Sequence, residues 1–270
     1  DTIQSRGLGD VYKRQDFTQW QREQMEGKDL ERLLGYWGKK LENLPELHLP
    51  TDYPRPAKVS YRGESCYFHL DANLTRRIDN LCENAGATRF MVLLAAFHIW
   101  LSRCSGQDDF GIGTPIANRQ RPDDMDLIGF FVNSLVMRGE LSQEENFLKF
   151  LKQVKETTLD AFDHHQLPFD LLVEHVSPKR YKDRNPLVQV VFGMQTAPPG
   201  EAVWGDKLTV APCPQKVETV RFDLEFHAWP VPEAEGEALH CFWIFSRDLW
   251  KSETMGRWTQ NFKTLLEGLI

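Results

Sequence analysis

The run at residues 128–138 (IGFFVNSLVMR) constrains this chain most, because apolar residues occupy both of its alternating sets of positions. Such a run predicts a strand that is buried on both faces. Asn133 and Ser134 lie in its middle. A buried amide or hydroxyl must find a hydrogen-bond partner or cost roughly 1–3 kcal/mol. These two side chains are therefore predicted to have a structural or a chemical task.

Composition excludes several classes of protein. The 270 residues carry a net charge of −7, which argues against binding to nucleic acid or to an anionic membrane surface. The longest apolar run, residues 90–99, is shorter than the ~20 residues that span a bilayer, and we see no signal peptide. The five cysteines form no C-x-x-C pair, which predicts reduced thiols, no zinc or disulfide framework and a cytoplasmic location.

The chain divides into three stretches. Residues 1–15 have no helical or strand period and resemble a junction or adapter-derived segment that is foreign to the fold. Residues 16–60 are predicted to form a helix and a proline-rich connector. Residues 61–270 are predicted to form a mixed β-sheet with packed helices, an α/β fold of the α+β type. We expect strands at 63–70, 110–116, 186–194, 208–211, 220–229 and 239–246, amphipathic helices at 74–85 and 90–101, a helix from a capping box at 142–145 to Pro168, and helices at 169–176 and 255–269.

The adjacent pair His164 and His165, followed by Asp170, allows two interpretations. The three residues could be a base with its orienting acid or the ligands of a metal. Neighbouring residues on a helix point about 100° apart, and the H-E-x-x-H spacing is absent, so a shared metal is disfavoured. In the simpler interpretation both histidines lie at the C-terminal end of a helix, near its dipole. No nucleophile elbow and no glycine-rich phosphate loop occurs in the sequence.

Three stretches together resemble the fifth, sixth and seventh core motifs of condensation domains from nonribosomal peptide synthetases. These are residues 128–138, 164–170 (HHQLPFD) and 183–187 (DRNPL). Residues 16–21 (DFTQWQ) resemble the fourth motif, and residues 113–119 (GTPIANR) resemble a strand and loop typical of the family. The five segments occur in the family's order, and the resemblance extends from residue 16 to the end of the chain.

The resemblance implies the C-terminal lobe of a two-lobed, chloramphenicol-acetyltransferase-like fold with a tunnel between the lobes. The implied reaction is amide-bond formation, in which the amine of an aminoacyl thioester on an acceptor carrier attacks the thioester of a donor carrier. No cofactor is expected to bind directly, because both substrates arrive on the phosphopantetheine arms of carrier domains. The other implied partners are an N-terminal lobe and an adjacent adenylation domain.

The sequence departs from the family by lacking its catalytic signature, two histidines, three residues and Asp-Gly, which lies before the fourth motif. His164 and His165 cannot replace it, because Asp170 is four residues past the second histidine and no glycine follows. No catalytic residue and no metal ligand is therefore assigned, and the chain alone is expected to form no peptide bond and to expose an apolar interface. The resemblance implies an ion pair between the signature aspartate and an arginine of this lobe, which we assign by position to Arg119.

The remaining candidates are expected to be structural or to line the tunnel. Asn133 and Ser134 are expected to hold the strand geometry at the junction of the lobes. Asn185 is the next candidate for a polar group near the tunnel, and Arg184 is expected to anchor its floor. The complete set of candidate residues is Arg119, Asn133, Ser134, Arg138, Gln166, Pro168, Arg184 and Asn185.

Two alternatives stay within the same superfamily. An epimerisation domain would abstract an α-proton instead of joining two substrates, and a noncatalytic docking module would recruit a partner enzyme to a carrier. The run FFVN at residues 130–133 favours condensation, because epimerisation domains usually diverge at this motif.

Overall fold

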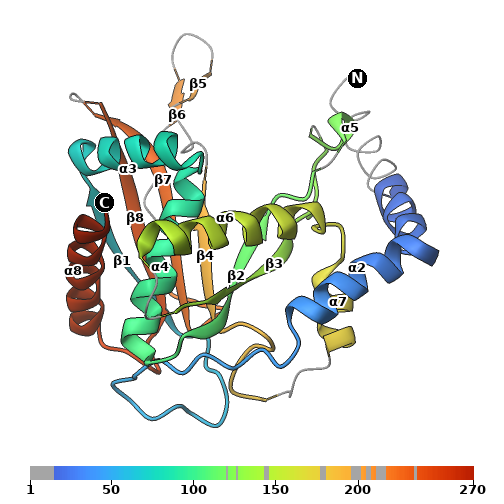
Figure 1. The fold of residues 1–270 in the computed structure, drawn as a ribbon, viewed down its shortest axis with the longest axis horizontal. Helices are drawn as coiled ribbons and strands as arrows, with labels where there is room; N and C mark the ends of the chain where they lie inside the picture. Colours follow the sequence, from blue (N-terminus) through green and yellow to red (C-terminus); the bar gives the residue numbers. More distant parts are fainter. Residues whose placement is uncertain are drawn as a thin grey trace.

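A six-stranded mixed sheet forms the centre of the molecule (Figure 1). The computed structural model describes residues 15–119, 121–125, 127–142, 146–176, 181–195, 202–204, 208–210, 217–233 and 236–270. The strand order is β1-β8-β7-β4-β2-β3, and β4 runs parallel to both of its neighbours while the other pairs are antiparallel. The predicted mixed sheet is thus confirmed. Its strands are β1 (Gly63–Leu70), β2 (Asp109–Ile116), β3 (Asn133–Glu140), β4 (Val190–Met194), β7 (Leu224–Glu233) and β8 (Gly236–Ser246), and β5 (Ala202–Trp204) pairs with β6 (Leu208–Val210) in a second sheet.

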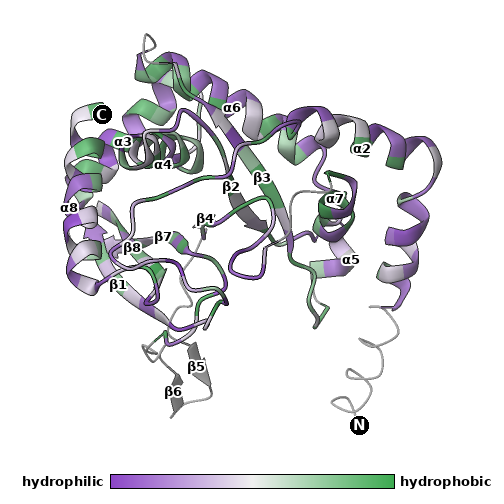
Figure 2. Ribbon diagram, turned by 90° about the horizontal axis from the view of Figure 1, so that it is seen from below, coloured by the Kyte–Doolittle hydropathy of each residue, from purple (hydrophilic) through white to green (hydrophobic). Residues whose placement is uncertain are grey.

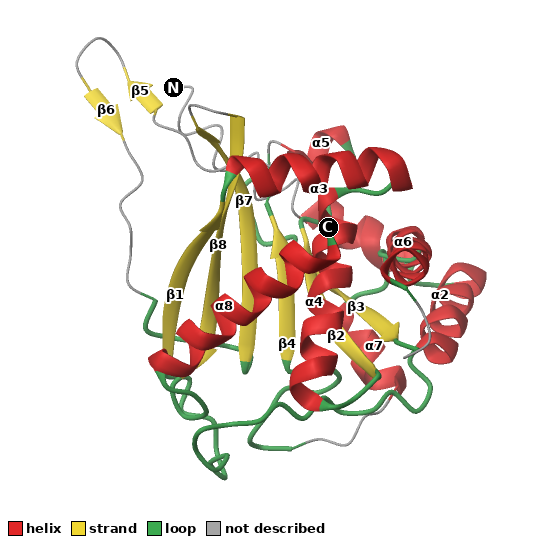
Figure 3. Cartoon of the chain, turned by 60° about the vertical axis from the view of Figure 1, so that its left-hand side comes forward, coloured by secondary structure: helices red, strands yellow, loops and turns green. Residues whose placement is uncertain are grey.

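Helices cover one face of the large sheet (Figure 3). Seen from below, α3, α4 and α8 lie on one side of the sheet, whereas α2, α5 and α7 lie beyond its β3 edge (Figure 2). The opposite face of β1, β8 and β7 carries no helix in the part of the chain that the structure describes. The helices are α2 (Gly27–Lys40), α3 (Ala72–Ala85), α4 (Arg89–Ser105), α5 (Pro122–Met125), α6 (Phe147–Asp163), α7 (Phe169–Val176) and α8 (Ser252–Leu269).

Helix α4 is the central helix, and the prediction that it is amphipathic was wrong. Buried residues occur on all of its sides, because α3, α6 and α8 pack around it over the sheet. Its start was predicted correctly, since the Thr88 side chain accepts a hydrogen bond from the Met91 amide at 3.3 Å. The end of α3 was also predicted correctly, because Gly86 adopts the left-handed conformation with φ of 57°.

His98 is a charge-free histidine in the core. It lies on α4, is 1% exposed, and its Nδ1 has no hydrogen-bond partner among the described residues. The backbone of β3 approaches the ring so closely that a Cβ on Gly139 would lie 2.6 Å from Nδ1. Burial lowers the pKa of His98 to about 3. The folded protein therefore excludes the proton that an unfolded chain would bind below about pH 6.5.

This difference predicts that stability falls as the pH falls from 6.5 towards 3. Between pH 7 and pH 5 the His98 contribution to the free energy of unfolding should fall by about 2 kcal/mol. Urea denaturation at both pH values should show a smaller drop for His98→Leu than for the wild type. The control His69→Gln, on the exposed surface of β1, should keep the wild-type drop. A wild-type drop in His98→Leu would contradict the assignment.

The predicted strand at 128–138 was wrong in its first half. Strand β3 begins at Asn133, because β2 ends opposite it at Ile116 and offers no partner to residues 128–132. Ile128, Phe130 and Val132 are consequently 80%, 72% and 47% exposed. The alternating apolar residues at 128–132 therefore form part of an exposed apolar surface and not of a strand buried on both faces.

Helix α6 begins later and ends earlier than predicted. Asn146 is its N-cap and accepts a hydrogen bond from the Lys149 amide at 3.0 Å. Residues 143–145 of the predicted capping box lie outside the described residues. The helix ends at Asp163, and a turn at 164–167 separates it from α7.

The N-terminal stretch contains two helices rather than one, followed by the predicted connector. Residues 15–24 are helical, and a turn at 25–26 separates them from α2, whose first residue Gly27 has a φ of 60°. The connector is tied to the C-terminal part of the chain, since Asp52 accepts from the Lys251 amide at 2.8 Å at the start of α8. Residues 1–14 lie outside the described residues, and the three-part division of the chain stays a prediction.

The described cysteines are all free thiols, and burial raises the pKa of three of them, Cys82, Cys104 and Cys241. Cys66, Cys82, Cys104 and Cys241 form no disulfide, whereas Cys213 lies outside the described residues. Burial raises the pKa of Cys82 and of Cys104 to about 11, so neither thiol is activated for chemistry.

No single described helix is both long and apolar enough to cross a membrane. Helices α3 and α4 together have the length and composition of a membrane span, but a bend of 104° separates them.

Candidate functional site

Asn133 joins two of the motif segments. Its buried side chain donates from Nδ2 to the carbonyl oxygens of His165 at 3.0 Å and Leu167 at 2.8 Å. Its Oδ1 accepts from the Phe169 amide at 3.0 Å. The first residue of β3 thereby holds the turn between α6 and α7. We call these three bonds the Asn133 joint.

The two adjacent histidines lie at the end of α6, as the simpler interpretation predicted. His164 Nδ1 donates to the Asp160 carbonyl at 2.8 Å, and its ring stacks on Tyr36 with 3.8 Å between the ring centroids. His165 Nδ1 donates to the Phe162 carbonyl. Both rings therefore serve the helix end, and among the described residues no group of three His, Cys, Asp or Glu could hold a metal ion.

Gln166 and Pro168 shape the turn that Asn133 holds. Gln166 Oε1 is buried without a hydrogen-bond partner among the described residues. The Pro168 carbonyl accepts from the Leu172 amide at 3.0 Å and so starts α7. Both residues were predicted as candidates, but their sequence positions do not reveal that the turn packs against β3.

Arg119 follows β2 and is held by an aromatic ring and a backbone carbonyl. Its guanidinium carbon lies 4.3 Å from the centroid of Phe131, and Nη1 donates to the carbonyl oxygen of Asp124. The buried Asp124 carboxylate pairs with Arg121 at 2.7 Å instead. Within the described ranges, no carboxylate lies at ion-pair distance from Arg119.

The surroundings of Arg119 are apolar and partly exposed. Phe131 is buried against Phe17 of the N-terminal helical segment, with 4.8 Å between ring centroids. The side chains before and after Phe131, those of Phe130 and Val132, are exposed. The contact between Phe131 and Phe17 was not predicted, because nothing in the spacing of residues 17 and 131 signals it.

Arg138 ties β3 to β2 and to the end of α2. Its guanidinium makes two hydrogen bonds to the Asp109 carboxylate, at 2.8 and 2.6 Å. Nη1 donates to the carbonyl oxygens of Lys40 and Glu42 at 3.0 and 2.9 Å. These contacts occupy most of its donors and give Arg138 a structural position.

Arg184 and Asn185 lie in the segment before β4. Arg184 pairs with Asp183 at 2.7 Å and with Glu46 of the connector. Asn185 Nδ2 donates to the Arg221 carbonyl at 2.5 Å. Both residues line a cavity of about 300 Å³ together with Leu41, Asn43, Leu44, Glu46, Val176, Tyr181, Pro186, Leu187 and Gln189.

Ser134 faces the opposite way from the Asn133 joint. It lies directly opposite Pro115 in the β2–β3 register, within the segment that resembles a family motif. Successive residues of a strand point to opposite faces. Since Leu135 is buried in the core, the Ser134 side chain lies on the other face of the sheet.

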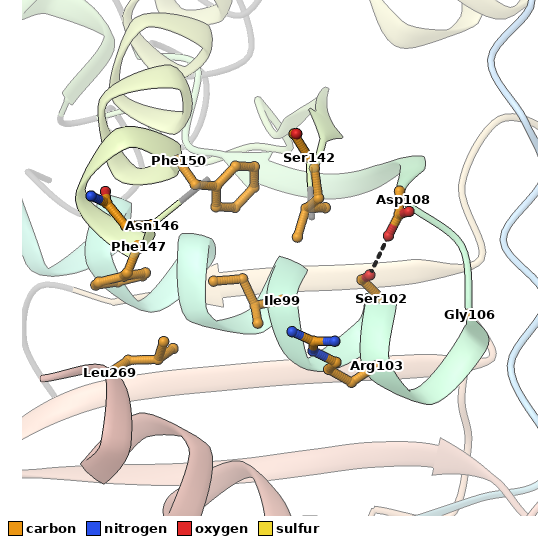
Figure 4. Close-up of a pocket in the computed structure, with 11 residues that line it drawn as sticks. Ile99, Ser102, Arg103, Gly106, Asp108, Ser142, Asn146, Phe147, Phe150 and Leu269 are labelled. Atoms are coloured by element: carbon orange, nitrogen blue, oxygen red, sulfur yellow. Dashed lines mark hydrogen bonds between the residues drawn. The ribbon is translucent and has the colours of Figure 1, made fainter. Parts of the chain in front are cut away.

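A separate cavity of about 280 Å³ lies where the ends of α4 and α8 meet the start of α6 (Figure 4). Ser102 donates to Asp108 at 2.9 Å on its wall, and Ile99, Phe147 and Phe150 supply apolar lining. None of the eight candidate residues lines it. This cavity is therefore not part of the motif site.

The comparison with protein families decides the identity of the fold. The condensation-domain family matches residues 8–270. This chain belongs to the condensation-domain family. The recognition made from five short motifs is thereby confirmed. The condensation-domain fold also confirms the predicted chloramphenicol-acetyltransferase-like class.

The similar relatives include two large synthetases. Chondramide synthase cmdD of Chondromyces crocatus is 37% identical over 255 residues, which are 94% of this chain and 6% of that protein. Tyrocidine synthase 2 of Brevibacillus parabrevis is 36% identical over 255 residues, 94% of this chain and 7% of that protein. This condensation-domain chain thus spans only a small part of the length of the relatives that it matches.

Solved structures share the fold. The X-domain from teicoplanin biosynthesis superposes with a TM-score of 0.83 at 24% identity, covering 94% of this chain and 58% of that one. A four-domain nonribosomal peptide synthetase bound to AMP and glycine gives a TM-score of 0.81 at 24% identity, covering 92% of this chain and 20% of that one.

Proposed function

We propose that this chain forms the C-terminal lobe of a condensation domain that joins two carrier-tethered acyl groups through an amide bond. The observation that carries the proposal concerns Arg119. Its guanidinium lies beside the exposed apolar segment 128–132 and pairs with no described carboxylate. A second lobe would bring the signature aspartate to this guanidinium and cover Ile128, Phe130 and Val132. The match to little more than half of the X-domain chain supports a second lobe.

The reaction needs positioning more than activation. The acceptor amine attacks the thioester carbonyl of the donor, so a C–N bond forms, the C–S bond breaks and the departing thiolate takes up a proton. Holding both reactants in line can supply a large part of the rate. His164 and His165 are used at the end of α6, so we assign proton transfer from the amine to the second lobe.

Carrier domains would be the immediate partners. The substrates would reach the tunnel on phosphopantetheine arms, so the lobe itself would bind no cofactor. The much longer relatives support neighbouring domains in the same protein, of which an adenylation domain is the one we propose. Asn133 and Arg184 would then keep the tunnel wall in shape without touching the reacting atoms.

The test uses the complete synthetase module that contains this chain, with chemically loaded donor and acceptor carriers in deuterated water. Condensation predicts an amide product without deuterium at the α-carbon. Deuterium at the α-carbon without an amide product would indicate epimerisation. Neither product, together with stable binding of a separate enzyme, would indicate a recruitment module, and either of these results would contradict the proposal.

A further inference from the structure

A ladder of aromatic rings crosses the helix-free face of the sheet. The strand register places Tyr67 of β1 opposite Phe242 of β8, and Phe242 opposite His227 of β7. The Tyr67 and Phe242 rings stack with 5.4 Å between centroids, and the Phe242 and His227 rings with 4.9 Å. Tyr67 is 57% exposed. The ladder is therefore accessible along one side of the sheet.

The same row of side chains continues to the motif strands. His227 lies opposite Gly193 of β4 in the register. A Cβ on Gly193 would lie 3.8 Å from Pro115 Cγ, and Pro115 lies opposite Ser134. One cross-strand row thus connects the aromatic ladder to the candidate residue Ser134. A substrate lying beside Ser134 and extending across the sheet would reach His227.

Glu225 and His227 form a carboxylate–imidazole pair in this row. Glu225 Oε2 lies 3.0 Å from His227 Nε2, and the two side chains are 14% and 17% exposed. No Lys or Arg of the described residues pairs with Glu225. His227 contacts Oε2 alone, so within the described part of the chain the second carboxylate oxygen of Glu225 can still accept a hydrogen bond from a ligand.

The position of His227 leaves no room for a larger neighbour. A Cβ on Gly193 would lie 2.8 Å from His227 Nδ1, so glycine at this position allows the imidazole to sit against β4. Phe242 stacks on the ring and Trp229 meets Phe242 edge-on, with 5.2 Å between their centroids. A fixed negative charge beside aromatic rings is suited to a cation.

We propose that the Glu225–His227 pair binds an ammonium group of the carrier-tethered substrate. The inference rests on the proposed condensation function, which places a tethered substrate on this side of the lobe. Partial burial strengthens the attraction between the carboxylate and an ammonium, because water screens it less. The ammonium could belong to the free α-amine of a donor chain or to a basic side chain, and the ligands of the test separate the two sources.

The test measures binding to the complete domain by isothermal titration calorimetry. The ligands are stable amide analogues of pantetheine thioesters: norleucyl with a free α-amine, N-acetyl-lysyl with a free side-chain amine, and N-acetyl-norleucyl with neither. We expect the affinity of one of the two ammonium ligands to exceed that of the neutral ligand by at least about tenfold. Which of them does so identifies the source of the ammonium.

Variants assign the preference to Glu225. Glu225→Gln should abolish the preference while leaving the affinity for the neutral ligand unchanged. Glu225→Asp, which keeps the charge, should retain part of it. Glu233→Gln, an exposed position at the end of the same strand, should bind all three ligands as the wild type does.

Two results would overturn the inference: equal affinities of the wild type for all three ligands, or an unchanged preference in Glu225→Gln. If Glu225→Gln does not fold, the decision passes to Glu225→Ala, which also removes the carboxylate, and a full wild-type preference in that variant would count against the pair. Binding requires no turnover, so a domain that prefers an ammonium ligand but forms no amide would refute the proposed function and leave this inference standing.

Discussion

Replacing Asn133 with alanine should lower the free energy of unfolding by about 3 kcal/mol, because it removes three hydrogen bonds in a buried environment. The carbonyls of His165 and Leu167 would lose a donor, and the Phe169 amide would lose its acceptor. Since the same bonds hold the turn between α6 and α7 against β3, amide formation by the complete domain should also fall severalfold or more.

Urea denaturation of the Asn133 variants provides the measurement. Asn133→Asp, which has nearly the same shape, should be at least as damaging as Asn133→Ala, because a carboxylate would face two carbonyl oxygens. Asn84→Ala, at an exposed position near the end of α3, should change stability by about 0.5 kcal/mol or less. If both Asn133 variants are as stable as the wild type, the three bonds of the Asn133 joint contribute little to the free energy of unfolding.

Replacing Arg119 with alanine should slow amide formation by the complete domain about 100-fold. The physical reason is the loss of the proposed charge pair between the two lobes, which would leave the signature aspartate unpaired where it is shielded from water, at a cost of about 2–5 kcal/mol. Arg119→Lys should retain part of the activity, because lysine keeps the charge but not the planar fork that binds a carboxylate at two points.

Single-turnover rates with loaded carriers measure this effect. Arg103→Ala provides a matched control, because Arg103 is an exposed arginine beside the cavity in Figure 4 and lies outside the motif site. Thermal melting of Arg119→Ala separates an inter-lobe effect from the loss of its bond to the Asp124 carbonyl. Wild-type rates in a folded Arg119→Ala domain would remove Arg119 from the proposed lobe junction.

The helices and strands that could be predicted are those whose bounds depend only on residues close together in the sequence. Strand β1 and helix α7 were predicted with their observed bounds, because period-2 and period-3.6 patterns there end at clear boundary residues. The cap at Thr88 and the helix end at Gly86 depend on the chemistry of single residues, and the sequence therefore reveals them.

The parts that could not be predicted depend on distant partners. Residues 128–132 look like half of a buried strand, but β2 ends before it can pair with them, and Ile128 and Phe130 are exposed as a result. Helix α4 looks amphipathic, yet it is enclosed because helices from three other parts of the chain pack around it.

The candidate site shows the same division. Asn133 was predicted to need a partner, and the structure supplies three backbone partners 32 to 36 residues further along the chain. Nothing in the spacing of these segments identifies those partners. The Glu225–His227 pair was visible only as the polar positions of an alternating strand, and its connection to Ser134 requires the order of the four strands β7, β4, β2 and β3.

Intact-protein mass spectrometry of the acceptor carrier tests the central claim most directly. The complete module, incubated with an acyl-loaded donor carrier and an aminoacyl-loaded acceptor carrier, should increase the mass of the acceptor by the mass of the donor acyl group less one hydrogen. The donor should return to its free thiol form at the same rate. An acceptor of unchanged mass beside a donor that stays loaded would contradict the assignment of this lobe to an amide-forming condensation domain.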